Sequence, residues 1–366
     1  MAIDISQPAP CTSAPPLQEA VRLQVVRGTD CLNACAAWAE QSTASAVENP
    51  SCDPRWLRVL AAGLGHRPYC ITAHEGERLC GLLPLAEISS LLFGKHLVGL
   101  PYVSTGGIQA TSSDVATQLA DAAVQLADER GVRHLQLRHE APVAHPALVS
   151  GVASKVHMRL ALPTDAELLW KALNAKVRNQ VRKSQNQSFN VEWGTEALLN
   201  DFYAVFSQNM RDLGTPVFSR RLFLAMLQHL PTELCVVRAG RLPIAAGVVL
   251  HGPRMSQVLS ASSLRSHNAR CPNMLLYWNL LVRSCERGQA TFDFGRTTID
   301  SNTYRFKAQW GAQPVPTAWQ FYVRRGQPGD MRPEQSGFRL ATKVWQRLPL
   351  PLTRWIGPLI IRGIPT

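Results

Sequence analysis

The sequence predicts an α/β protein made of two copies of one strand-and-helix unit. Its 366 residues, 46% of them hydrophobic, are enough for about two domains with sizeable cores. The order hairpin, helix, strand occurs once in each half of the chain. Matching residues of the two halves, Cys70 with Cys235 and Gly131 with Gly288, are separated by nearly equal lengths of sequence. These offsets indicate a duplicated unit; a chance similarity of ordinary αβ segments is the alternative.

The first copy follows residues 1–16, a leader that we expect to be disordered. Apolar periodicity and turn residues then predict a strand, two helices, a hairpin, an amphipathic helix that ends at Gly131, and another strand. In chain order these elements are expected at residues 17–26, 29–41, 54–65, 67–89, 113–130 and 132–140. Together they form a predicted N-terminal domain over residues 17–160.

The second copy repeats this order over a predicted C-terminal domain, residues 161–325. Two helices precede a hairpin that turns at Gly240, and a strand, a helix ending at Gly288 and two further strands follow. We expect these elements at residues 195–211, 219–229, 232–252, 254–263, 273–287, 290–295 and 316–325. The remainder, residues 326–366, is a basic tail.

Charge and cysteine usage limit the partners and the compartment. The chain has 38 Lys and Arg against 26 Asp and Glu, a net charge of +12, which favours an anionic partner. Its nine Cys are scattered without a C-x-x-C pair, so we expect free thiols, no metal site and a reducing compartment. Because neither a signal peptide nor an 18-residue apolar run is present, we expect a cytoplasmic protein.

Common catalytic motifs are absent, which argues against P-loop NTPases, Rossmann dehydrogenases, α/β-hydrolases and zincins. One informative constellation is a polar loop directly before the helix at 273–287, because the N–H groups at a helix N-terminus bind anions. The side chains that we expect to hold a phosphate there are Arg265, Asn268, Arg270 and Asn273. A capped helix with a solvated basic loop is the alternative.

Two further groups of residues are candidates for chemistry. Asp293 and Arg296 lie at the end of a predicted strand, where α/β sheets place ligands, and Tyr304, Lys307 and Trp310 can share one helical face. A helix that ends at Gly214 carries the second group, Asn209, Arg211 and Asp212. Asp212 is expected to accept a proton or orient an amine; a surface ion pair at a helix stop is the alternative.

Two basic segments have open interpretations. The run over residues 171–183 is a solvated helix face or a surface that steers a phosphate-bearing substrate. The tail mixes Lys and Arg with Trp345, Trp355 and branched aliphatics, which is typical of an interface with anionic lipid. Packing of the tail on the body is the alternative, because Pro349, Pro351 and Pro358 interrupt a long helix.

Several of these stretches resemble the FemAB-like branch of the GNAT acyltransferase superfamily, in particular the proteins associated with exosortase/PEP-CTERM systems. The resemblance covers roughly residues 20–365, and its most specific block is FDFGRTTIDSNTYRFKAQWGA, residues 292–312. The other matching stretches are PYVSTGGI, KVRNQVRKSQ, NMRDLGTPVFSRRLF, NMLLYWNLL and the tail KVWQRLPLPLTRWIGPLIIRGIP.

The resemblance implies two tandem GNAT-like domains, each a mixed, mostly antiparallel twisted sheet flanked by helices. It implies transfer of an acyl or aminoacyl group to an amine or hydroxyl of a cell-envelope glycan or exopolysaccharide precursor, with no tightly bound cofactor. On this basis we expect the catalytic residues to be Asp212, Asp293, Tyr304 and Lys307. The residues expected to bind substrate are Tyr102, Asn209, Arg211, Arg296 and Trp310.

The donor and the partners are left open at this point. Acyl-coenzyme A and aminoacyl-tRNA are both candidate co-substrates, although no two-helix insertion of the tRNA-using enzymes is present and tRNA is therefore not favoured. A lipid-linked sugar precursor is the expected partner, with the inner-membrane surface as a further one through the tail, and DNA is not expected. The alternative is a catalytically inactive pair of GNAT-like domains that binds components of the exopolysaccharide machinery.

Overall fold

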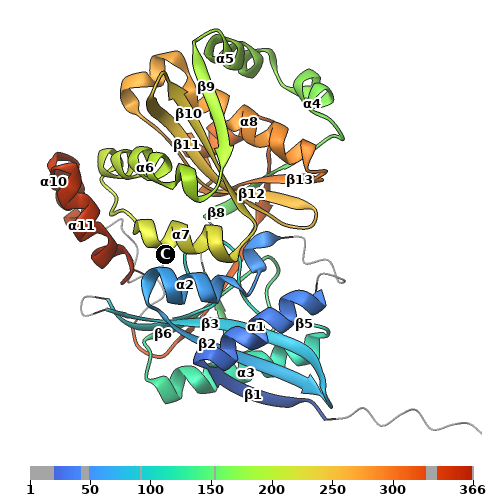
Figure 1. Ribbon diagram of the computed structural model, residues 1–366. Coiled ribbons are helices and arrows are strands. Elements are labelled where there is room, and N and C mark those ends of the chain that lie inside the picture. The colour runs from blue at the N-terminus through green and yellow to red at the C-terminus, as the bar shows by residue number, and fades with distance from the viewer. Residues whose placement is uncertain (1–19, 43–48, 91–92, 152–153, 327–335, 365–366) are drawn as a thin grey trace, which may run out of the picture.

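The computed structural model describes residues 20–42, 49–90, 93–151, 154–326 and 336–364 (Figure 1). Two mixed sheets lie one above the other with helices between them and on both outer faces (Figure 1). This architecture confirms the predicted α/β class. The predicted leader, residues 1–16, lies outside the described residues.

The N-terminal sheet has the strand order β1-β2-β3-β4-β6-β15-β7, with β5 paired to β3. Neighbouring strands are antiparallel except for the parallel pair β4 and β6. The strands are β1 (Arg22–Arg27), β2 (Arg67–Glu75), β3 (Arg78–Ser90), β4 (Gly94–Val98), β5 (Gln109–Ala110), β6 (His134–His139), β7 (Val149–Ser150) and β15 (Ala318–Val323). Helices α1 (Gly28–Ser42), α2 (Trp56–Leu64) and α3 (Ser113–Arg130) accompany it.

The C-terminal sheet has the order β14-β8-β13-β12-β11-β10-β9, and its only parallel pair among the described residues is β12 with β13. The strands are β8 (Lys155–Ala161), β9 (Phe189–Gly194), β10 (Thr232–Ala239), β11 (Leu242–His251), β12 (Met255–Ser263), β13 (Thr291–Thr298) and β14 (Gln313–Pro316). Its helices are α4 (Ala166–Ala172), α5 (Ala175–Gln185), α6 (Leu199–Leu213), α7 (Arg220–His229), α8 (Pro272–Glu286) and α9 (Asn302–Ala308).

Three apolar cores hold these layers together. One joins the two halves, because α1 and α2 pack with α6 and α7 between the sheets. The outer face of the N-terminal sheet packs on α3, and the outer face of the C-terminal sheet packs on α4, α5 and α8. Both faces of each sheet are therefore covered, which explains why β3 is buried over ten consecutive residues and reads as a continuous apolar run.

The chain crosses between the two sheets in a way that differs from the predicted division at residue 160. Strand β8 begins at Lys155 and belongs to the C-terminal sheet, whereas β15 returns to the N-terminal sheet and pairs with β6. The segments 17–160 and 161–325 therefore exchange one strand each. Sequence periodicity identifies a strand such as β15 but contains no information about which sheet it joins.

The basic run over residues 171–183 covers the end of α4 and most of α5. Helix α5 buries Val177, Val181 and Ser184 and exposes Lys176, Arg182 and Lys183. The run is therefore a solvated helix face on an amphipathic helix.

The tail forms two helices, α10 (Ser336–Arg347) and α11 (Leu350–Ile361), that pack on α6. The break between them falls at Pro349. Arg354 donates from Nε to Ser207 Oγ at 2.9 Å, and Tyr102 donates its hydroxyl to the carbonyl of Arg362 at 2.9 Å. Within the described residues, each helix is too short or too polar to cross a bilayer.

Candidate active site

The candidate site begins where β12 and β13 separate. Their parallel pairing covers only three residue pairs and ends at Gln257 with Asp293, and beyond this point β12 pairs only with β11. On its other side β13 has an irregular register between Asp293 and Arg296. The two strands therefore diverge around an opening that side chains do not fill, and a cavity of about 590 Å³ occupies it.

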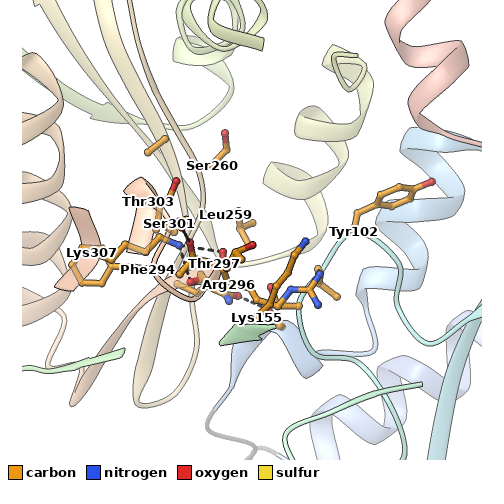
Figure 2. Close-up of a pocket in the computed structure, with 18 of the residues that line it drawn as sticks. Tyr102, Lys155, Leu259, Ser260, Phe294, Arg296, Thr297, Ser301, Thr303 and Lys307 are labelled. Atoms are coloured by element: carbon orange, nitrogen blue, oxygen red, sulfur yellow. Dashed lines mark hydrogen bonds between the residues drawn. The ribbon is translucent and has the colours of Figure 1, made fainter. Parts of the chain in front are cut away.

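Both halves of the molecule line this cavity (Figure 2). The C-terminal half contributes Gln257–Ala261 of β12, Phe294–Thr298 of β13 and Lys307 of α9. The N-terminal half contributes Arg138 of β6 and a loop in which Tyr102 has a φ of +68°. A bulky residue in this left-handed conformation is strained, and such strain is concentrated at functional sites.

The charges around the cavity are all of one sign. Four cationic side chains line it: Arg138, Lys155, Arg296 and Lys307. Among the described residues that line it, none is Asp or Glu. The cavity therefore presents a positive potential to any ligand.

Lys307 extends from α9 to the bulged end of β13, and its side chain is buried. Its Nζ donates to the carbonyl of Gly295 at 2.8 Å and to that of Arg296 at 3.2 Å. Burial lowers the pKa of Lys307 to about 8, and the negative charge of Asp293 opposes this only in part. The amine is therefore close to half-protonated at mildly alkaline pH.

Arg296 and Arg138 meet at the ring of Trp319. The guanidinium carbon of Arg296 lies 3.3 Å from the ring centroid and that of Arg138 lies 4.1 Å from it. The indole itself is fixed, because Nε1 of Trp319 donates to the carbonyl of Ser104 at 3.0 Å. Burial lowers the pKa of Arg296 to about 10.

Asp293 lies beneath the cavity and is fully buried. Its Oδ2 is 2.7 Å from His157 Nδ1 and accepts from Arg159 Nε at 3.3 Å, and its Oδ1 accepts the N–H of Gly295 at 2.7 Å. Burial disfavours its charge, but His157, Arg159 and Gly295 outweigh this and hold the pKa of Asp293 below its usual value. The carboxylate therefore organises the point at which the strands separate rather than facing the cavity.

The structure brings together some of the predicted residues and not others. Arg296, Lys307 and Tyr102 line the cavity. Asn209 lies near it, since its Nδ2 donates to Ser262 Oγ on β12 at 3.2 Å. Arg211 and Asp212 instead form an ion pair of 2.7 Å with each other, and the carbonyl of Asp212 accepts from Gln346 of the tail at 3.1 Å.

The predicted residues Tyr304 on α9 and Trp310 just after it do not line the cavity either. Trp310 is buried in the core of the C-terminal sheet, and Tyr304 packs against the same core. This places them behind the cavity wall, where Tyr277 stacks on Phe294 and contacts Trp310. Their position supports the cavity wall through packing.

The predicted phosphate-binding residues lie together at the start of α8, outside the cavity lining. Arg265, Asn268 and Arg270 are exposed on a short 3-10 turn, and Asn273 is in the first turn of α8. The first turn of α8 has no side-chain cap. Pro272 has no N–H, and the N–H groups of Met274 and Leu275 donate to the carbonyl of Cys271, which leaves the N–H of Asn273 in this turn for an anion.

Sequence reasoning missed the residues that the N-terminal half and the crossing strands supply. Arg138 was part of a predicted strand, and His157 and Trp319 were in segments without a motif. The one available signal was the number of polar side chains in the predicted strand VRHLQLRHE, in which only Val132, Leu135 and Leu137 are apolar.

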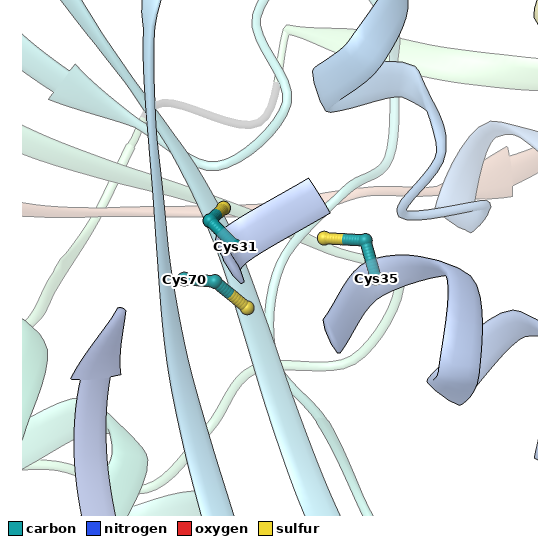
Figure 3. Close-up of side chains that lie close together, drawn as sticks. All are labelled: Cys31, Cys35 and Cys70. Atoms are coloured by element: carbon teal, nitrogen blue, oxygen red, sulfur yellow. The ribbon is translucent and has the colours of Figure 1, made fainter. Parts of the chain in front are cut away.

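One group of side chains has the composition of a metal site. The sulfur atoms of Cys31, Cys35 and Cys70 lie within 4.8 Å of one another, between α1 and β2 (Figure 3). All three are buried in the core between the two sheets. In the described part of the chain no fourth His, Cys, Asp or Glu completes this group. A structural zinc site takes four such ligands, so the trio fits apolar packing better than zinc.

Comparison with known proteins agrees with this geometry. A model of the GNAT acetyltransferase domain matches residues 172–308, which include β12, α8, β13 and α9. No curated protein sequence matches the chain. The matching segment contains the diverging strands and the predicted phosphate site.

Solved structures show the same arrangement over both halves. FemX is 12% identical with a TM-score of 0.57, over 74% of this chain and 90% of that one. L-PGS from Bacillus licheniformis is 12% identical with a TM-score of 0.53, over 86% and 97%. A tandem GNAT protein from the clavulanic acid biosynthesis pathway is 11% identical with a TM-score of 0.51, over 84% and 100%. The fold is therefore a pair of tandem GNAT-like domains.

Proposed function

We propose that this protein is an acyltransferase that transfers an acyl or aminoacyl group to an amine or hydroxyl of a cell-envelope glycan or exopolysaccharide precursor, in a system of the exosortase/PEP-CTERM type. The observation that carries the proposal is the opening between β12 and β13, which holds a cavity lined by both halves. Backbone groups of β12 beyond Gln257 that face away from β11 have no strand partner there. They are free to bind the carbonyl of a donor and its developing oxyanion.

Lys307 is the proposed general base. Two carbonyl groups occupy two of the three positions on its Nζ, so the neutral amine has one position left for a proton. The attacking amine or hydroxyl gives its proton to Lys307 as its bond to the donor carbonyl forms. Lys307 then returns the proton to the departing thiolate or ribose oxygen of the donor. A base with a pKa near the working pH is well suited to this step.

Phosphates of the donor are proposed to bind at the start of α8. Arg265 and Arg270 are exposed there, beside a helix N-terminus that has no side-chain cap and in which Asn273 supplies the N–H. Acyl-coenzyme A and aminoacyl-tRNA both carry phosphates, so this site accommodates either. Holding donor and acceptor side by side in one cavity accelerates the transfer reaction without a covalent enzyme intermediate.

Membrane binding through the tail is a separate proposal. Trp355 and Leu359 of α11 are 72% and 62% exposed although the helix is docked on α6. Exposed apolar side chains beside cations are typical of contact with an anionic lipid surface. Replacing Trp355 and Leu359 by Ser should release the protein from vesicles containing phosphatidylglycerol, whereas Leu242→Ser, at a similarly exposed apolar residue in a hairpin, should not. Unchanged vesicle binding of the double variant would refute this role of the tail.

A thermal-shift titration tests the transferase proposal first, with acetyl-, succinyl- and longer acyl-coenzyme A and with charged and uncharged tRNA. A ligand that binds only the folded protein raises its midpoint. We expect a shift with one donor class that is lost in Arg270→Ala and kept in Arg241→Ala, an exposed Arg in a hairpin turn. The proposal also requires turnover of that donor with an acceptor, abolished in Lys307→Met. Binding of a glycan precursor without any donor shift would favour the inactive binding protein.

A further inference from the structure

We propose that the C-terminal helix α11 is a strap that completes the cavity: it holds Tyr102 in the cavity wall and couples the shape of that wall to the docking of the tail. A lipid surface that binds the docked tail then acts as a positive effector of the cavity. The strap itself is independent of the transfer reaction, and only its lipid effector rests on the membrane binding proposed above.

Tyr102 lines the cavity in a backbone conformation that its own side chain disfavours. Its φ is +68°, and Leu100 in the same loop has a φ of +44°. The two ends of this loop are anchored, because Gly99 and Gly106 each donate a backbone N–H to β6. Bulky residues keep left-handed backbone only where the surrounding contacts enforce it. Tyr102, between the two anchors, therefore needs contacts of its own.

The tail supplies one of these contacts. The hydroxyl of Tyr102 donates to the carbonyl of Arg362, directly after α11, at 2.9 Å. The same hydroxyl lies 3.0 Å from Nε2 of His66, and the two rings stack. Figure 2 shows the side chain of Tyr102 directed away from Arg296 and Lys155 of the cavity. A hydrogen bond to the end of the tail therefore helps to fix where this part of the cavity wall lies.

A second residue of the cavity wall is held by the same helix. Phe218 lines the cavity and meets the ring of Tyr102 edge-on, with the ring centroids 5.3 Å apart. It directly follows Val217, against which α11 packs at Gly357. The tail therefore contacts the cavity wall at two places, one in each half of the molecule.

The tail also bridges the two halves outside the cavity. Helix α11 packs on α6 of the C-terminal half and leads toward α2 of the N-terminal half (Figure 1). Gly363, just beyond the helix, lies against the end of β3, where an added Cβ would be 2.9 Å from Ser90 Oγ. Because both halves line the cavity, a segment fixed to both limits how far they separate.

Lipid contact and docking use opposite faces of α11. Thr353, Gly357 and Ile361 are buried on the docked face, whereas Trp355 and Leu359 are exposed. The docked face holds a hydroxyl, a glycine and one isoleucine, so undocking would add little apolar surface for a lipid. A lipid surface therefore binds the docked helix without displacing it. Binding to the docked state increases its population, and with it the population in which Tyr102 is held.

Hydrogen exchange measured by mass spectrometry tests the strap in solution, with residues 99–106 and 350–364 as the reporting segments. Tyr102→Phe removes the hydroxyl and keeps the ring, so both segments should exchange about two- to tenfold faster, the range for one hydrogen bond. Tyr322→Phe is the matched control. It also loses a hydroxyl hydrogen bond, to Asp128, but lies on β15 and should leave both segments unchanged.

The coupling must also act from the tail to the loop, because linkage is reciprocal. In Gly357→Ala, which disturbs docking at Val217, residues 99–106 should exchange faster although their sequence is unchanged. Leu359→Ser, on the exposed face, is the control and should leave the loop as in the wild type. Tyr102→Phe should have a smaller effect in the Gly357→Ala background than alone. Loop exchange that is unaffected by Gly357→Ala, or fully additive effects, would overturn the strap.

Vesicles containing phosphatidylglycerol test the lipid effector, with vesicles of phosphatidylcholine alone as the control. In the bound wild type, residues 99–106 should exchange at least about fivefold more slowly, the lower end of typical allosteric couplings. Tyr102→Phe should bind these vesicles equally well and show no such slowing. Bound wild type with unchanged loop exchange would overturn the lipid effector.

The three proposals can fail separately. If the wild type does not bind vesicles, the membrane role of the tail and the lipid effector are both overturned, whereas the exchange measurements in solution still decide the strap. None of these measurements uses a donor or an acceptor. Absence of turnover would therefore overturn only the proposed transferase function.

Discussion

The imidazole Nδ1 of His157 and the carboxylate Oδ2 of Asp293 lie 2.7 Å apart, and both side chains are fully buried. The other ring nitrogen of His157 is 3.2 Å from Thr105 Oγ1 in the N-terminal half. Asn49 bonds both to Thr105 and to Glu140, and Glu140 pairs with Arg159. A chain of polar contacts thus connects the two halves at the residue where β12 and β13 separate.

Asp293→Asn should destabilise the protein by about 3–5 kcal/mol at pH 7, which is the range expected when one partner of a buried ion pair is removed. The pKa of Asp293 is below its usual 3.8 in the folded state, so its contribution is complete above that pH and is lost as the pH falls further. Urea unfolding from pH 7 to pH 3 should therefore show a difference between wild type and variant that is constant down to about pH 4 and begins to shrink below it. The control is Asp300→Asn, an exposed Asp with a φ of +61° that Asn also tolerates. A stability difference of Asp293→Asn that is independent of pH would contradict this assignment.

Lys307 should titrate near pH 8, because burial lowers the pKa of its amine. NMR of isotope-labelled lysine should show one amine with this pKa, and its signal should be missing from Lys307→Arg.

If the neutral amine of Lys307 is the base, kcat/KM rises with pH and levels off above about 8, since Lys307 of the free enzyme must be deprotonated. Lys307→Arg keeps a positive charge but takes no proton, so it should lose at least about a hundredfold in rate. Full activity in Lys307→Arg would show that only the charge is needed.

The helices and strands were predictable because each depends on the pattern of apolar and turn residues within its own segment of sequence. The helix at 113–130, its end at Gly131 and the hairpin turn at Gly240 depend on periodicity and turn residues close in sequence. The exchange of β8 and β15 between the sheets depends on contacts between residues far apart, such as Trp319 opposite Arg138. No local pattern specifies such a pairing.

The candidate site was predictable only in the C-terminal half. Arg296 and Lys307 follow a strand end in a recognisable block, and the cavity contains both. Arg138 and His157 are polar residues in strands, where alternation usually places such side chains in solvent. Here both faces of the sheets are covered, so the same alternation places them inside. Asp212 was attractive as a carboxylate near a helix end, but Arg211 already pairs with it.

The trio of Cys31, Cys35 and Cys70 should behave as apolar packing and not as a zinc site. Removing metal with a chelator should leave the thermal midpoint unchanged, because three thiols without a fourth ligand leave zinc incompletely coordinated. The three thiols, each at most 1% exposed, should react with Ellman's reagent only at the rate of unfolding, after the partly exposed Cys52 and Cys271. One equivalent of metal per chain and a chelator-sensitive midpoint would contradict this prediction.

Docking of the tail should depend on Gly357, where α11 packs against Val217. A Cβ at this position would lie 2.8 Å from the backbone N of Val217 and 2.8 Å from its Cγ1. The backbone of Val217 cannot move aside as a flexible side chain can, so Gly357→Ala should destabilise the docked tail by about 1–3 kcal/mol.

Gly194→Ala is the control, because only the side chain of Leu198 lies near a Cβ at that position, at 3.2 Å. Limited proteolysis should cleave α11 faster in Gly357→Ala alone. Equal proteolysis of the two variants would show that the tail is held by its other contacts, chiefly Arg354 with Ser207.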